Sequence, residues 1–212
     1  MSEQIRLLKL DAISLSQHLD LTEDDDCFYW REFTARTDYT RSPTNQLITN
    51  FKILPTAKHR LHHKTGAINQ IVEEFIQINN SDRPYEEYTF VPIPPSKIST
   101  HPDFDDRLNI VLQRVSNRKN IKMDIRPLIT QNIDTESAHT NQAPRLTIAE
   151  LCDLYQINED IISPTPKKIV IFDDVLTKGT HFKAMQKTLQ KIYPDVPIVG
   201  LFIALSVYPI DQ

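Results

Sequence analysis

Apolar side chains recur along the middle of the chain at helical and strand spacings in turn. From Ala67 onward they fall on one helical face, and residues 87–94 then form an apolar run that ends in proline. A second helical stripe over 108–115 precedes a strand-like alternation over 121–125. The pattern predicts a helix followed by a strand, twice in succession.

The last third of the chain repeats this order. Residues 147–155 begin with the Thr-x-x-Glu spacing of a capping box and continue as an apolar helical face. Residues 168–172 form a short continuous apolar run, typical of a strand buried on both faces, and a helical face over 182–192 leads to a final buried strand over 198–205. Strands that alternate with helices predict an α/β fold with a parallel sheet covered on both sides. Such sheets bind ligands at the carboxyl ends of their strands.

Three segments lack a clear period. Residues 1–26 are weakly apolar and end in the acidic run from Glu23 to Asp26, which we expect to be a solvated loop. Residues 27–53 hold aromatic and β-branched side chains broken by polar ones, a pattern that predicts a strand or a short helix. The stretch 130–145 is the most polar and least periodic part of the chain, and we expect it to be a mobile surface loop.

Composition and charge narrow the classes of function. The 212 residues suffice for one domain with elaborations or two small ones. The 24 Lys and Arg residues are outnumbered by 28 Asp and Glu, and the formal net charge of -4 provides no general basic field for nucleic acid or an anionic membrane. The three glycines exclude Gly-rich nucleotide loops of the GxGxxG or Walker type.

The cysteines and the apolar runs indicate where the protein works. Cys27 and Cys152 are too few for a disulfide framework and too far apart for a metal knuckle, which fits a reducing cytoplasm. The longest apolar run, Ile198 to Val207, is about half of what spans a bilayer, so no membrane partner is expected. The sequence therefore predicts a cytoplasmic protein.

The residues with the clearest chemical potential follow directly after the apolar run that ends at Phe172. Asp173 and Asp174 follow it, and carboxylates at the end of a buried strand are costly unless hydroxyl groups or a hydrated metal ion meet them. Small, hydroxylated and basic residues then fill the turn from Thr177 to Thr180, and a helix begins beyond it. Backbone N–H groups in such a turn suit a phosphate. The segment predicts a binding site for a sugar and its phosphate.

The same segment resembles a known family. Residues 169–180, Ile-Val-Ile-Phe-Asp-Asp-Val-Leu-Thr-Lys-Gly-Thr, are similar to the phosphoribosyl pyrophosphate (PRPP) motif of type I phosphoribosyltransferases. The resemblance implies that Asp173 and Asp174 bind the ribose hydroxyls, directly or through Mg²⁺, and that the turn holds the 5′-phosphate through Thr177, Lys178, Gly179 and Thr180. In this sequence Lys178 replaces the usual second Thr, and Thr180 follows Gly179 without a spacer.

Further segments support the resemblance. Residues 90–97 are similar to the strand and pyrophosphate loop of these enzymes, which implies pyrophosphate contacts from Pro95, Ser96, Lys97 and Arg107. Residues 47–52 loosely resemble a segment of ComF-like members. The polar stretch 130–145 occupies the place of the family's closing loop, which makes Arg145 and His139 candidates for the active centre.

The resemblance implies a Rossmann-like parallel sheet flanked by helices, with residues 1–60 as an N-terminal extension or hood and 61–212 as the core. It implies an enzyme that binds PRPP with Mg²⁺ and transfers the phosphoribosyl group to a nitrogen acceptor, and it is compatible with a homodimer. Lys178 and the Thr spacing depart from the family pattern. The alternative is therefore a regulatory protein of the same fold that senses PRPP or a nucleotide and catalyses no reaction. A third hypothesis is that the basic segment 58–64 contacts nucleic acid. The alternative for this segment is a solvated, positively charged start of a helix.

Overall fold

The computed structural model describes residues 5–78, 85–134 and 146–208. The strands are β1 (Leu8–Lys9), β2 (Cys27–Thr34), β3 (Tyr88–Pro92), β4 (Asp124–Ile125), β5 (Ile129–Gln131), β6 (Tyr155–Ile157), β7 (Lys168–Leu176) and β8 (Ile198–Val207). The helices are α1 (Ala12–Leu15), α2 (Pro43–Phe51), α3 (Leu61–Ile78), α4 (Arg107–Lys119), α5 (Ile148–Leu154) and α6 (Thr180–Gln190), with 3-10 turns at Lys58–Arg60, Tyr85–Glu87 and Glu159–Ile161.

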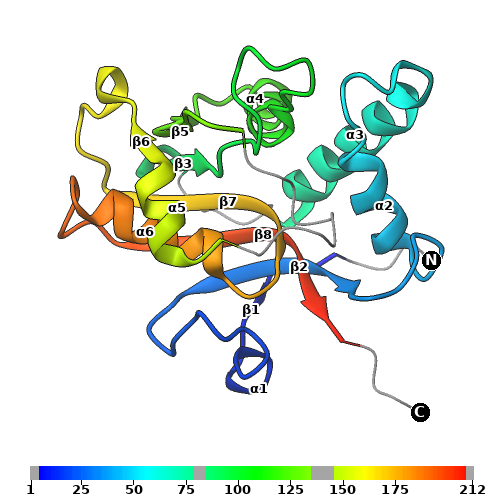
Figure 1. Ribbon diagram of the computed structural model, residues 1–212, viewed down its shortest axis with the longest axis horizontal. Coiled ribbons are helices and arrows are strands. Elements are labelled where there is room, and N and C mark those ends of the chain that lie inside the picture. Colours follow the sequence, from blue (N-terminus) through cyan, green and yellow to red (C-terminus); the bar gives the residue numbers. More distant parts are fainter. Residues whose placement is uncertain (1–4, 79–84, 135–145, 209–212) are drawn as a thin grey trace.

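Six of these strands form one sheet, in the order β1-β2-β8-β7-β3-β4. All neighbours in it are parallel except β1, which pairs antiparallel with β2. The strands β2, β8 and β7 run side by side through the middle of the molecule (Figure 1). The predicted α/β fold with a mostly parallel sheet flanked by helices is confirmed.

Helices cover both faces of this sheet. On one face Phe172 of β7 lies between Trp30 of β2 and Phe75 of α3, with ring centroids 6.5 Å and 5.8 Å away. On the other face Phe182 of α6 packs edge-on against Phe202 of β8 at 6.1 Å. Phe172, Phe75, Phe182 and Phe202 are all fully buried, so their burial stabilises the layered structure on both sides.

Several elements differ from their predicted extent. The strand expected to end at Phe172 continues to Leu176, because Val175 and Leu176 are themselves buried and pair with β8. The helix that begins with the predicted capping box at Thr147 ends at Leu154, and Tyr155 starts β6 instead of continuing the helical face. The strand expected over 121–125 is reduced to β4.

The N-terminal part of the chain is built into the same sheet. Strand β2 pairs with β8 over its length, and α2 packs against α3 and β2. Residues 23–26 are not wholly solvated as expected, because Asp25 is buried against Lys183. The division of the chain at residue 60 stays a prediction about its organisation.

Two further expectations concern the loop and the membrane. The predicted mobile loop begins with residues of β5, and its larger part, 135–145, lies outside the described residues. Within the described ranges, no helix is both long and apolar enough to cross a bilayer.

Candidate functional site

The carboxyl end of β3 lies beside the acidic pair in the carboxyl half of β7. Pro92 pairs with Phe172, and the N–H of Ile93 donates to the Phe172 carbonyl at 3.0 Å. The loop that follows β3 therefore leaves the sheet beside Asp173 and Asp174. Two segments that lie far apart in the sequence thus converge at the place where ligands bind in parallel sheets.

Asp174 is held by two cations. Its Oδ1 lies 2.9 Å from Lys52 Nζ and its Oδ2 lies 2.6 Å from Arg107 Nη2, and its side chain is only 6% exposed. Burial alone would raise the pKa of Asp174, but the charges of Lys52 and Arg107 and their hydrogen bonds outweigh burial and lower that pKa below its usual range. Asp174 is therefore a carboxylate with both oxygens engaged.

The charged network extends beneath Asp174. Arg107 Nη1 also donates to Asp105 Oδ2 at 2.9 Å, and the same oxygen accepts from Lys64 Nζ at 2.6 Å. Lys64 donates further to the carbonyl of Ile53, so it is buried and fully used inside the protein. The interpretation of 58–64 as a wholly solvated or nucleic-acid-binding segment is wrong at Lys64, although His59 and Arg60 are exposed.

Sequence reasoning missed Lys64 and Asp105 as members of this network. Lys64 sits among basic residues whose pattern is that of a surface helix start, and nothing in it signals a buried ammonium group. Lys52 has one signal, the ComF-like resemblance of the segment that it ends. These side chains are far apart in the sequence, and only the packing of α2, α3 and α4 brings them together.

Asp173 differs from its neighbour. It is partly exposed at the sheet edge, and its Oδ1 accepts the N–H of Asp174 at 2.7 Å. Burial raises the pKa of Asp173, and the negative charge of Asp174 raises it further, to about 7. Adjacent acids at one strand end therefore have opposite pKa shifts, and Asp173 is the one that a ligand can reach.

The turn from Thr177 to Thr180 joins β7 to α6. Thr177 is exposed, Lys178 and Thr180 are partly exposed, and Gly179 is buried. Gly179 has φ 91°, in the left-handed region, and occupies the N-cap of α6, where it offers no side chain to cap the helix. The amide groups at a helix N-terminus lack intrahelical acceptors, so this turn can hold an anion.

A segment from the N-terminal part of the chain lies on this turn. Asp20 Oδ2 accepts from Thr180 Oγ1 at 2.5 Å, and the Asp20 N–H donates to the carbonyl of Lys178 at 3.1 Å. The side chain of Leu21 packs directly over Gly179. No sequence pattern before β2 indicated these contacts.

We expect Gly179→Ala to lower the free energy of unfolding by about 2 kcal/mol, measured by urea denaturation. An L-residue is strained at this φ, and the added Cβ would lie 2.5 Å from Leu21 Cδ2. Gly66 in α3 provides the control, because a Cβ there meets nothing within 4 Å. Gly66→Ala should stabilise the protein by about 0.5–1 kcal/mol. Equal effects at both positions would contradict the interpretation of the turn.

A cavity of ≈ 250 Å³ lies beside the loop after β3. Its lining includes Pro95 and Lys97, two of the residues predicted to contact pyrophosphate, together with Asp106. Burial raises the pKa of Asp106, although its hydrogen bond from Asn109 opposes that shift. The Arg107 side chain, also predicted to contact pyrophosphate, instead bonds to Asp105 and Asp174 in this structure, and the pyrophosphate assignment stays a prediction.

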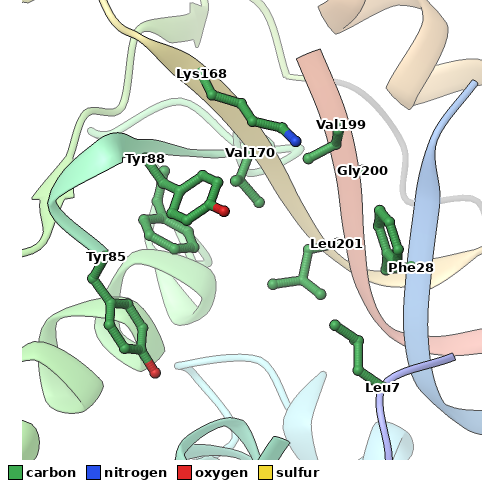
Figure 2. Close-up of a pocket in the computed structure, with 10 residues that line it drawn as sticks. Leu7, Phe28, Tyr85, Tyr88, Lys168, Val170, Val199, Gly200 and Leu201 are labelled. Carbon is green, nitrogen blue, oxygen red and sulfur yellow. The ribbon is translucent and has the colours of Figure 1, made fainter. Parts of the chain in front are cut away.

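A second cavity, of ≈ 100 Å³, is apolar (Figure 2). Leu7, Phe28, Val170 and Leu201 are among the side chains that line it. Val170 precedes Asp173 on β7, so this cavity lies toward the amino end of the strands and away from the acidic pair. It therefore does not belong to the candidate site.

One carboxylate at the site, that of Asp173, suits a Mg²⁺ ion. The described part of the chain contains no group of three or more His, Cys, Asp or Glu side chains that could hold a metal ion. Mg²⁺ is commonly bound by one or two carboxylates together with waters and substrate phosphates, and the accessible Asp173 suits that mode. Asp174 suits it less, because two cations already engage its oxygens.

Two predicted site residues, Arg145 and His139, lie outside the described residues. No protein-family model matches the chain, and a search of curated proteins finds no match either. The case for a function therefore depends on the motifs and on the geometry of the residues described above.

Proposed function

We propose that the carboxyl ends of β3 and β7 bind PRPP together with Mg²⁺, as the resemblance to type I phosphoribosyltransferases implies. The observation that carries the proposal is the adjacency of the two motif segments: Ile93 N–H bonds to Phe172 O at 3.0 Å, so the loop after β3 departs beside Asp173. The motifs are far apart in the sequence, and the parallel pairing of β3 with β7 brings them side by side.

Each part of the ligand has a matching chemical group. The Asp173 carboxylate would accept hydrogen bonds from the ribose hydroxyls, because it is the accessible acid of the pair. The turn from Thr177 to Thr180 would hold the 5′-phosphate with its backbone amides. Ser96 and Lys97 would face the pyrophosphate, where a Lys ammonium group favours negative charge.

Transfer requires charge stabilisation at both ends of the breaking bond. The bond between ribose C1 and a pyrophosphate oxygen breaks while the nitrogen lone pair of the acceptor forms a bond to C1, so positive charge develops on the sugar. A carboxylate near the ribose stabilises that charge. Mg²⁺ would neutralise the charge of the departing pyrophosphate. Asp173 is the group of this chain assigned to the sugar, and its neighbour Asp174 is kept ionised by Lys52 and Arg107.

We expect Asp173→Asn to weaken PRPP binding at least about tenfold in calorimetry with Mg²⁺ at pH about 8, since it removes charged acceptor oxygens from the ribose. Asp195→Asn is the matched control, because Asp195 is exposed and precedes β8 at the opposite end of the sheet. It should bind like the wild type. Equal binding by the wild type and Asp173→Asn would refute the assigned site.

A second candidate is a protein that binds PRPP without turnover. The engagement of both Asp174 oxygens by Lys52 and Arg107 favours it, because that acid is already used as the partner of two cations in this structure. Pyrophosphate release against a panel of nitrogen bases separates the candidates. An enzyme releases pyrophosphate with at least one base, whereas a sensor binds PRPP and releases none above the buffer blank.

A further inference from the structure

The turn that precedes α6 is already occupied by another part of the same chain. We name residues 18–25 the N-terminal strap. Asp20 of the strap accepts a hydrogen bond from Thr180 Oγ1 at 2.5 Å, and its N–H donates to Lys178 O at 3.1 Å. The carboxylate of Asp20 therefore stands at the N-terminus of an 11-residue helix whose own N-cap contributes no side-chain hydrogen bond.

Further contacts fasten the strap on both sides of Asp20. His18 Nδ1 contacts the carbonyl of Thr177, and Leu21 packs over Gly179. Lys183 Nζ, one turn into α6, lies 2.8 Å and 2.9 Å from the two carboxylate oxygens of Asp25. The strap thus contacts every residue of the turn and Lys183 in the first turn of the helix.

The docking of the strap is incomplete in one respect. His18 is 2% exposed, and among the described residues its Nε2 has no hydrogen-bond partner. An unsatisfied buried nitrogen opposes docking, because the group loses its water without gaining a partner. Asp20, by contrast, supplies a negative charge where the helix N-terminus favours one. The Asp20 carboxylate is therefore an anion at the helix N-terminus, and it accepts from the hydroxyl of Thr180, one of the residues predicted to bind the phosphate.

We propose that the N-terminal strap is an autoinhibitory element in which the Asp20 carboxylate occupies the phosphate position at the N-terminus of α6. The proposal rests on the proposed function, and it adds regulation to that site. A phosphate and the Asp20 carboxylate cannot share the position, because the two anions repel each other and Thr180 Oγ1 already donates to Asp20. Ligand binding therefore requires the strap to leave, and any partner that captures the strap would activate the site.

The test uses inorganic phosphate as the probe, which makes it independent of sugar recognition. Asp20→Asn should bind phosphate about tenfold more tightly than the wild type, followed by amide shifts of Gly179 and Thr180 in NMR titrations. Asp24→Asn is the control, because Asp24 is exposed on the same strap, and it should match the wild type. Leu21→Ala, which loosens the strap but keeps its charges, should also bind phosphate more tightly.

The outcomes separate the two proposals. Unchanged phosphate affinity in both folded variants, Asp20→Asn and Leu21→Ala, would overturn the autoinhibitory role, even if the wild type binds PRPP through Asp173. Tighter phosphate binding by both variants, with no PRPP binding by any form, would support the strap and refute the proposed function. Tighter binding of both phosphate and PRPP by Asp20→Asn supports both.

Discussion

Replacing Asp174 by asparagine is expected to lower the free energy of unfolding by about 3–5 kcal/mol. The substitution keeps the shape of the side chain but removes the charge that Lys52 and Arg107 share at 2.9 Å and 2.6 Å. Both cations are largely buried, so each would lose a charged partner without regaining water, and Arg107 would keep only Asp105 of its two ion pairs. Urea denaturation at neutral pH measures the loss.

The acid side of the stability profile gives a second readout of the same ion pairs. Because the folded-state pKa of Asp174 is lowered, its contribution is present above the unfolded pKa and is lost as pH falls through the folded pKa. The difference in free energy of unfolding between the wild type and Asp174→Asn should therefore largely disappear in strong acid. Asp195→Asn should stay within about 0.5 kcal/mol of the wild type throughout. A deficit below about 1 kcal/mol at neutral pH would show that solvent screens the pairs.

Asp173→Asn is expected to have the opposite effect and to stabilise the protein at about pH 8. The folded-state pKa of Asp173 is raised to about 7, so its favourable contribution is present below the unfolded pKa and is lost as pH rises through the folded pKa. The shift sets a ceiling of about 4 kcal/mol, and partial exposure reduces the expected gain to about 1–2 kcal/mol. Thermal unfolding at several pH values measures it.

The pH dependence distinguishes this effect from improved packing. At about pH 4 the wild-type Asp173 is protonated in the folded state, so the gain from asparagine should nearly vanish. Asparagine retains an oxygen that can accept the N–H of Asp174, which leaves the local backbone unchanged. A gain that is the same at both pH values would refute the raised pKa. Together with weaker PRPP binding, a gain confined to high pH would mark Asp173 as an acid kept for function at the expense of stability.

The strands β3, β7 and β8 and the helices α3, α4 and α6 could be predicted because their side chains repeat with a clear period. The run at 168–172 has the continuous apolar character of a doubly buried strand, and β7 confirms it. The continuation of β7 to Leu176 could not be predicted, because two acids interrupt the run and only pairing with β8 shows that the strand goes on. Periodicity reports local burial and carries no information about strand partners.

The candidate site could be predicted only where chemistry is concentrated in sequence. Asp173, Asp174 and the turn after them are contiguous, whereas Lys64, Asp105 and the strap come from other parts of the chain. The sequence does not distinguish a buried lysine from a solvated one, because burial is decided by the surrounding fold. The lowered pKa of Asp174 arises from the distant cations Lys52 and Arg107, and the raised pKa of Asp173 arises from burial and the charge of Asp174. Neither shift could be derived from the motif.

The position of β2 in the sheet has a consequence for biosynthesis. Residues 27–34 are made early, but their parallel partner in the sheet is β8, over 198–207. Pairing of β2 with β8 must therefore wait until nearly the whole described chain has left the ribosome, and during that interval Tyr29 lacks its β8 partner Phe202. Completion of the sheet is consequently late and non-local, because its central strand β8 comes last among the strands described.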